Sequence, residues 1–170
     1  MNILADLLTT SRIVIVVYIL YIGISRGEDR LLLIVALTAV AWITDVLDGI
    51  FARRTANATR LGHFDLVADL GLALVLSTCM ILWDVVSLIP AVIIWALAGA
   101  AARITRGQAP LQLAMALVYL TLIITLMKIH PFWGWALVVS LGFLAAINRK
   151  RFSQLASQFL DQIANIFLKV

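Results

Sequence analysis

Long apolar segments separated by short polar turns fill most of this chain and limit the folds it can adopt. The segment 31–51, for example, carries Asp45 and Asp48 as its only charged residues. Hydrophobic residues make up 64% of the chain and charged residues 13%, whereas a soluble domain is about half apolar and about a quarter charged. With a mean hydropathy of +1.07, the chain is predicted to be an all-α protein that crosses a membrane several times.

Six apolar segments are predicted to be transmembrane helices. They are Leu7–Ser25, Leu31–Phe51, Phe64–Val86, Ser87–Ala102, Pro110–Met127 and Pro131–Ile147. Some are shorter than the roughly 20 residues that span hydrocarbon, so fusion or re-entry of segments stays open. Together they form one predicted membrane domain, residues 1–150.

The basic residues are divided unevenly between the two sides that six spans create. Ten fall on the side of the termini, including Arg53, Arg54 and Arg60 in the predicted loop 52–62, and three fall on the other side. Because cytoplasmic loops carry an excess of Lys and Arg, both termini and this loop are predicted to face the cytoplasm from the cytoplasmic membrane. The net charge of +4 then suits anionic lipid, and no nucleic-acid partner is expected.

Residues 151–170 have a different pattern. Apolar residues such as Phe152, Leu155 and Phe159 recur at helical spacing, and the other face is polar. This predicts an amphipathic C-terminal helix that lies in the membrane interface, anchored by the basic cluster at 148–151. Packing of this helix on the protein's own cytoplasmic face or on a second subunit is an equal alternative.

Four aspartates lie between positions 45 and 69 of this otherwise apolar chain. Asp45 and Asp48 are three residues apart, and Asp65 and Asp69 are four apart, so each pair shares one helix face. A carboxylate inside a membrane costs at least a few kcal/mol unless it is satisfied, and neighbouring carboxylates repel one another. A divalent cation makes their convergence favourable, and all-oxygen ligation suits Mg²⁺, Mn²⁺ or Ca²⁺.

Plainer explanations exist for parts of this stretch. One or two of the aspartates could form structural ion pairs with the arginines of the loop. Gly49 follows Asp48 directly and would permit close approach of another helix or of a ligand. Gly62 could simply form a loop turn.

The stretch resembles the signature of the CDP-alcohol phosphotransferases, integral membrane enzymes of phospholipid synthesis. That signature reads D-x2-D-G-x2-A-R-x8-G-x3-D-x3-D. The chain matches its first part at Asp45, Asp48, Gly49, Ala52, Arg53 and Gly62. Asp65 and Asp69 keep the family spacing between them, but Asp65 follows Gly62 one residue early. The segment DLLTTSRI at 6–13 is also similar to one that often precedes the first helix of the family. In general look the chain is similar to small bacterial members of the phosphatidylglycerophosphate synthase type.

The resemblance implies a role for each matching position. The four aspartates would hold two divalent ions, Mg²⁺ or Mn²⁺, and Asp69 would also be the general base on an acceptor hydroxyl. The remaining matches would bind the nucleotide and phosphates of a CDP-linked lipid such as CDP-diacylglycerol: Gly49, Ala52, Arg53 and Gly62. The phosphatidyl group would pass to a small hydroxyl acceptor with release of CMP. Homodimers are common in the family.

The acceptor is less well defined than the donor. Arg103 and Arg106, at the predicted cytoplasmic end of the fourth helix, resemble arginines near the acceptor pocket of relatives. Two guanidinium groups suit a phosphate-bearing acceptor such as glycerol 3-phosphate or an inositol phosphate. Anchoring of the membrane end is an equal alternative, and the stretch 106–113 lacks the lysines that relatives making phosphatidylglycerophosphate often carry.

Two other functions compete with the enzyme. The missing residue before Asp65 would turn an α-helix by about 100°, which could aim Asp65 and Asp69 away from a metal site. The chain would then be an inactive descendant that serves as a membrane subunit or lipid-binding scaffold. Ion or proton transport is the general reading of intramembrane carboxylates, but the four aspartates lie near one membrane edge and Asp84 stands alone near the other.

Overall fold

A computed structural model of the chain describes residues 2–54, 65–105 and 107–147. Within these ranges the protein is helical, with six α-helices and one short 3-10 helix. The all-α prediction is therefore confirmed. The chain divides into two compact units, Met1–Val86 and Ser87–Val170, and each is described by itself.

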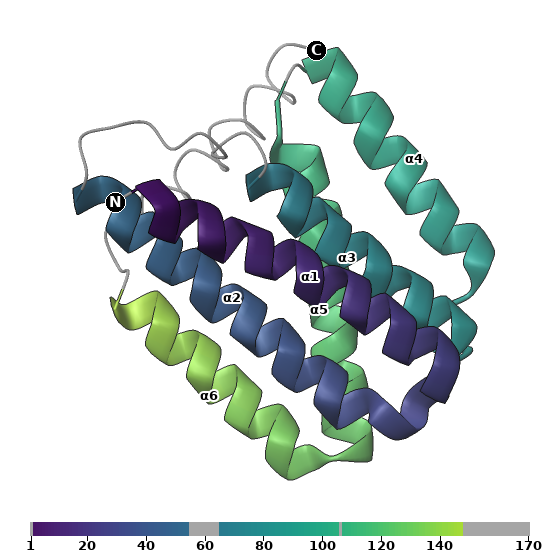
Figure 1. Ribbon diagram of the computed structural model, residues 1–170. Coiled ribbons are helices and arrows are strands. Elements are labelled where there is room, and N and C mark those ends of the chain that lie inside the picture. Colours follow the sequence, from purple (N-terminus) through teal and green to yellow (C-terminus); the bar gives the residue numbers. More distant parts are fainter. Residues whose placement is uncertain (1, 55–64, 106, 148–170) are drawn as a thin grey trace. The chain divides into compact units, whose positions relative to one another are not determined.

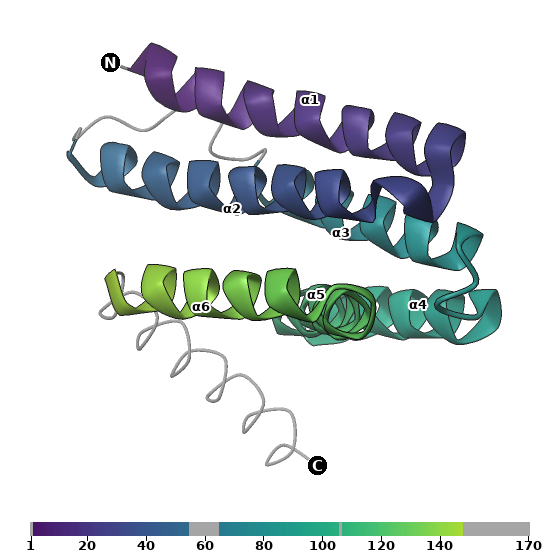
Figure 2. The same ribbon diagram turned by 90° about the horizontal axis from the view of Figure 1, so that it is seen from below.

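The first unit consists of α1 (Asn2–Arg26), the 3-10 helix η1 (Gly27–Arg30), α2 (Leu31–Arg54) and α3 (Asp65–Leu82). The polar segment of η1 reverses the chain, so that α2 returns along α1 (Figures 1 and 2). Helix α1 packs against both α2 and α3. A long side chain on α1 can therefore reach residues of both other helices.

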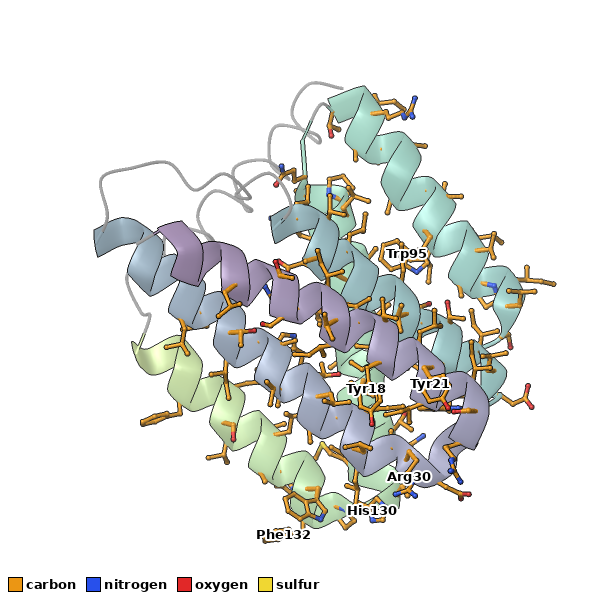
Figure 3. All side chains as sticks on the ribbon, viewed as in Figure 1. Tyr18, Tyr21, Arg30, Trp95, His130 and Phe132 are labelled. Atoms are coloured by element: carbon orange, nitrogen blue, oxygen red, sulfur yellow. The ribbon has the colours of Figure 1, made fainter. Side chains whose placement is uncertain are left out.

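The second unit consists of α4 (Leu88–Thr105), α5 (Ala109–Ile129) and α6 (Pro131–Ile147), and α5 packs against both α4 and α6. Each helix has a proline in its first turn: Pro90, Pro110 and Pro131. Backbone N–H groups in the first turn of a helix have no partner within the helix. The N–H that proline lacks is therefore no loss there, and these prolines begin helices without weakening them. In Figure 3, His130 and Phe132 mark the short connection between α5 and α6.

Two boundaries differ informatively from the prediction. Helix α2 continues through Arg54, so Ala52 and Arg53 are helical and not part of a loop. Helix α3 ends at Leu82, because Asp84 adopts a positive φ of 56°. The N–H groups of Asp84 and Val85 donate to the carbonyls of Ile81 and Met80, at 3.1 and 2.9 Å. This is the bonding pattern of a Schellman cap, and it gives Asp84 a structural role.

The helices differ in how clearly they qualify as membrane spans. Among the described residues, α4 and α5 are long and apolar enough to cross a membrane. Shorter apolar stretches occupy Leu31–Leu47, Leu66–Leu82 and Pro131–Phe143. These findings fit a membrane protein, while the full set of six spans stays a prediction. The predicted C-terminal helix, residues 151–170, lies outside the described residues.

The described helices bury a mainly apolar core that includes a few polar side chains, and they expose many large apolar side chains. Arg12, Thr38 and Ser77 are buried, whereas Ile89 and Val139 are among many exposed apolar residues. Hydroxyl groups within helices donate to the carbonyl one turn earlier, as Thr38 does to Ile34 at 2.8 Å. This bond satisfies the hydroxyl without breaking the helix. The arrangement suits a lipid exterior, where polar groups need partners within the protein.

Helices α1 and α3 approach each other closely where Gly23 faces Cys79. A Cβ atom on Gly23 would collide with the Cys79 sulfur, and it would lie 3.4 Å from the Cys79 Cβ. Next to this contact, the Trp83 indole N–H donates to the Gly23 carbonyl at 3.2 Å. Gly23 is therefore required for the close approach of the two helices.

We expect Gly23→Ala to lower the apparent Tm of the detergent-solubilised protein. Overpacking a well-packed site costs about 1–3 kcal/mol, which exceeds the gain of about 0.5–1 kcal/mol from replacing glycine within a helix. Gly99→Ala is the matched control, because nothing lies within 4 Å of its added Cβ. Removing the sulfur with Cys79→Ala should partly restore the Tm of the Gly23 variant. Equal shifts for both glycine variants would contradict the packing argument.

Candidate active site

A single arginine on the first helix joins two of the four signature aspartates. The Nη1 atom of Arg12 lies 2.9 Å from Oδ1 of Asp45 and 3.1 Å from Oδ1 of Asp69. Both contacts are hydrogen bonds as well as ion pairs. Arg12 belongs to α1, Asp45 to α2 and Asp69 to α3, so this cluster links all three long helices of the first unit.

The cluster lies well within α1 and α2 but only one turn inside α3, where Asp69 is four residues, or about 6 Å, beyond the first residue. Arg12 is ten residues beyond the start of α1, which corresponds to about 15 Å along its axis. Asp45 is nine residues before the end of α2, or about 14 Å. The helices around it are strongly apolar, so these charges depend on one another. Removing one carboxylate would leave the buried guanidinium without part of its compensation.

The pair of carboxylates supplies oxygen atoms, the type of ligand that a hard divalent cation prefers. Two oxygens that share one nitrogen at about 3 Å can be no more than about 6 Å apart. Metal ions in two-metal sites lie about 3.5–4 Å apart, so carboxylates at this separation can serve one such site. Among the residues that the structure describes, no group of three or more potential metal ligands is found.

The other two aspartates are placed only by their backbone. Asp48 lies on α2 one turn beyond Asp45, and Asp65 is the first residue of α3, one turn before Asp69. Their side chains lie outside the described part of the chain. The structure therefore brings together one aspartate from each half of the signature, and the metal-ligand roles of all four stay predictions.

The contact to Asp69 bears on the missing residue before Asp65. Asp69 lies beside Arg12 together with Asp45, so α3 directs this carboxylate toward α1 and α2. The shorter spacing has not aimed Asp69 away from its partner in the first half of the signature. How residues 62–64 accommodate the difference lies outside the described residues.

The remaining predicted site residues are less well defined. The last two turns of α2 contain Gly49, Ala52 and Arg53, whose side-chain surroundings are not described. Gly62 lies outside the described residues. Arg103 is exposed in the last turn of α4. Arg106 falls outside the described residues. Arg103 belongs to the second unit, so its position relative to the aspartates is not defined.

Sequence reasoning assigned no role to Arg12. Arg12 lies in the segment 6–13 that is similar to the family pattern, and it is one of the ten basic residues on the side of the termini. One signal could have identified it, because an arginine inside an apolar helix needs an acidic partner. The choice among the aspartates of the chain required the packing of α1 against both α2 and α3.

Comparison with known proteins identifies the family. The sequence profile of the CDP-alcohol phosphatidyltransferases matches residues 2–163 and so covers nearly the whole chain. No curated protein and no solved structure gives a significant match. Members of this family transfer a phosphatidyl group from a CDP-alcohol donor to an alcohol acceptor in phospholipid biosynthesis. The chain, whose Arg12, Asp45 and Asp69 meet among three apolar helices, belongs to the CDP-alcohol phosphatidyltransferase family.

Proposed function

We propose that this protein is an active enzyme that transfers a phosphatidyl group from a CDP-linked lipid, such as CDP-diacylglycerol, to a small hydroxyl acceptor and releases CMP. One observation carries the proposal: Arg12 holds Asp45, from the first half of the signature, and Asp69, from the second half, at one point. Metal-assisted phosphoryl transfer needs carboxylates from both halves of the signature close together, which this contact provides.

The four aspartates are the proposed ligands of two divalent ions, Mg²⁺ or Mn²⁺. Such ions, when bound, neutralise the charge of the donor diphosphate and polarise the bond to CMP. Asp69 is the proposed general base that takes the proton of the acceptor hydroxyl. This role requires the hydroxyl to bind within hydrogen-bond reach of the Asp69 carboxylate. Donor binding involves the last turns of α2 and the following segment: Gly49, Ala52, Arg53 and Gly62. Phosphoryl transfer depends mainly on positioning and charge neutralisation, which this division of roles supplies.

The proposed setting is the cytoplasmic face of the membrane. The excess of basic residues on the side of the termini supports a cytoplasmic location for both ends and for the segment after α2. A site at this depth lets the acyl chains of the donor stay in the bilayer while the nucleotide faces the cytoplasm. Residues 151–170 would lie along the same surface as an amphipathic helix.

We expect Asp69→Asn to abolish activity. An amide cannot accept the proton of the acceptor, and loss of a general base lowers rates by about 10²–10⁴-fold. The measurement is CMP release from CDP-diacylglycerol with Mg²⁺ or Mn²⁺ and a panel of hydroxyl acceptors.

Asp84→Asn is the matched control for this variant. Asp84 is exposed and caps α3 in a left-handed conformation that asparagine also adopts, so activity and fold should be kept. Absence of CMP release by the wild-type protein with every acceptor would contradict the enzyme and favour the scaffold. Wild-type activity of Asp69→Asn would contradict the role of Asp69.

We propose a phosphate-bearing acceptor, such as glycerol 3-phosphate, recognised by Arg103 and Arg106. Arg103 is exposed in the last turn of α4, so Arg103→Met should leave the fold intact. Loss of one charge-assisted hydrogen bond, worth about 1.5–3 kcal/mol, should raise the KM for the acceptor about tenfold or more while the KM for the donor stays unchanged. Lys128→Met, at an exposed position in the last turn of α5, is the control. An unchanged acceptor KM would make Arg103 a membrane anchor only.

A further inference from the structure

We propose that Arg12 is a positioning residue that orients Asp45 and Asp69 for divalent-metal binding from the buried side of the site. This inference rests on the proposed metal-dependent function and extends it to a residue outside the signature. It differs from the simpler idea that Arg12 is a counter-ion that occupies the place of the metal and leaves when the metal binds.

The exposure of the three side chains separates these two ideas. The side chain of Arg12 is 2% exposed, whereas those of Asp45 and Asp69 are 34% and 41% exposed. The guanidinium group is therefore closed off from its surroundings, whereas each carboxylate keeps an open side. A counter-ion that exchanged with an arriving metal would need to be reachable from that open side.

The hydrogen bonds have the form expected of an orienting group. One nitrogen, Nη1, donates to Oδ1 of both carboxylates, so the two bonds fix the position of one aspartate relative to the other. A carboxylate has two oxygens and about four acceptor positions, so a bond to Arg12 does not prevent it from ligating a metal. Carboxylate ligands of metals are commonly held by such outer hydrogen bonds.

The charge of Arg12 and its geometry act in opposite directions on metal affinity. A positive charge near a cation weakens binding, whereas a fixed pair of ligand oxygens strengthens it because less ordering is required on binding. Because two hydrogen bonds from one buried nitrogen fix the positions of both ligand oxygens, we expect the second effect to dominate. Substitution of Arg12 should therefore weaken metal binding, although it removes a repulsive charge.

Mn²⁺ binding to the purified, detergent-solubilised full chain tests this directly, without substrate. Electron paramagnetic resonance of free Mn²⁺ during a titration gives the dissociation constant. We expect Arg12→Met to raise it about 10–100-fold, the usual effect of losing an outer-shell partner. Arg12→Lys should raise it several-fold, since an ammonium keeps the charge and can donate to both oxygens but reaches less far.

The matched controls are Arg30→Met and Arg30→Lys. Arg30 is exposed at the end of η1 (Figure 3), beyond the end of α1 that lies 14 residues after Arg12. These variants should bind Mn²⁺ as the wild type does. A second measurement is the Mn²⁺ dependence of CMP release. In Arg12→Lys the half-saturating Mn²⁺ concentration should rise several-fold, with an unchanged KM for CDP-diacylglycerol at saturating Mn²⁺.

Tighter Mn²⁺ binding by Arg12→Met, or unchanged binding by Arg12→Lys, would overturn the inference and make Arg12 a competing counter-ion or a structural partner. If Arg12→Met fails to fold, Arg12→Lys decides alone, because it keeps the charge of the ion pair.

The inference and the proposed function can fail separately. Wild-type protein that binds Mn²⁺, loses affinity on substitution of Arg12 and releases no CMP would uphold the positioning role and contradict the enzyme. If the wild type releases CMP and the Arg12→Lys variant binds Mn²⁺ as tightly as the wild type, the enzyme is upheld and the positioning role of Arg12 is contradicted.

Discussion

The ion pair that Arg12 makes with Asp45 and Asp69 is the interaction on which the first unit depends. Three apolar helices would otherwise bring two carboxylates close together without compensation. A buried guanidinium stabilises both, and in doing so it links residues that are 33 and 57 positions away in the chain. The same bonds that permit the fold thus place two signature aspartates beside each other.

The surrounding helices make this arrangement possible by close packing. Gly23 lets α1 approach α3, and the Trp83 indole bonds to the Gly23 carbonyl at the same contact. Association between helices in lipid depends on such small residues and on hydrogen bonds, because the hydrophobic effect does not favour one apolar contact over another there. Close packing of α1 in turn fixes where Arg12 can reach.

The position of the cluster suits the chemistry of the family. A reaction that joins a lipid to a polar acceptor needs charged groups at the edge of an apolar environment, and phosphoryl transfer needs them in fixed positions. Rigid helices supply such positions more accurately than loops do. Helix α2 extends to Arg54, so Gly49, Ala52 and Arg53 are also carried by a helix and not by a loop.

The helical class, the approximate extent of the helices and the family could all be predicted from the sequence. Apolar segments and signature spacing are local properties, so they can be read without knowledge of packing. The end of α3 at Leu82 could not be predicted in this way, because the cap depends on the backbone conformation of Asp84. The packing of three helices was needed to show that Asp69 lies near Asp45 despite the missing residue and that Arg12 binds both. These contacts connect three helices, and no local pattern records which faces of separate helices pack together.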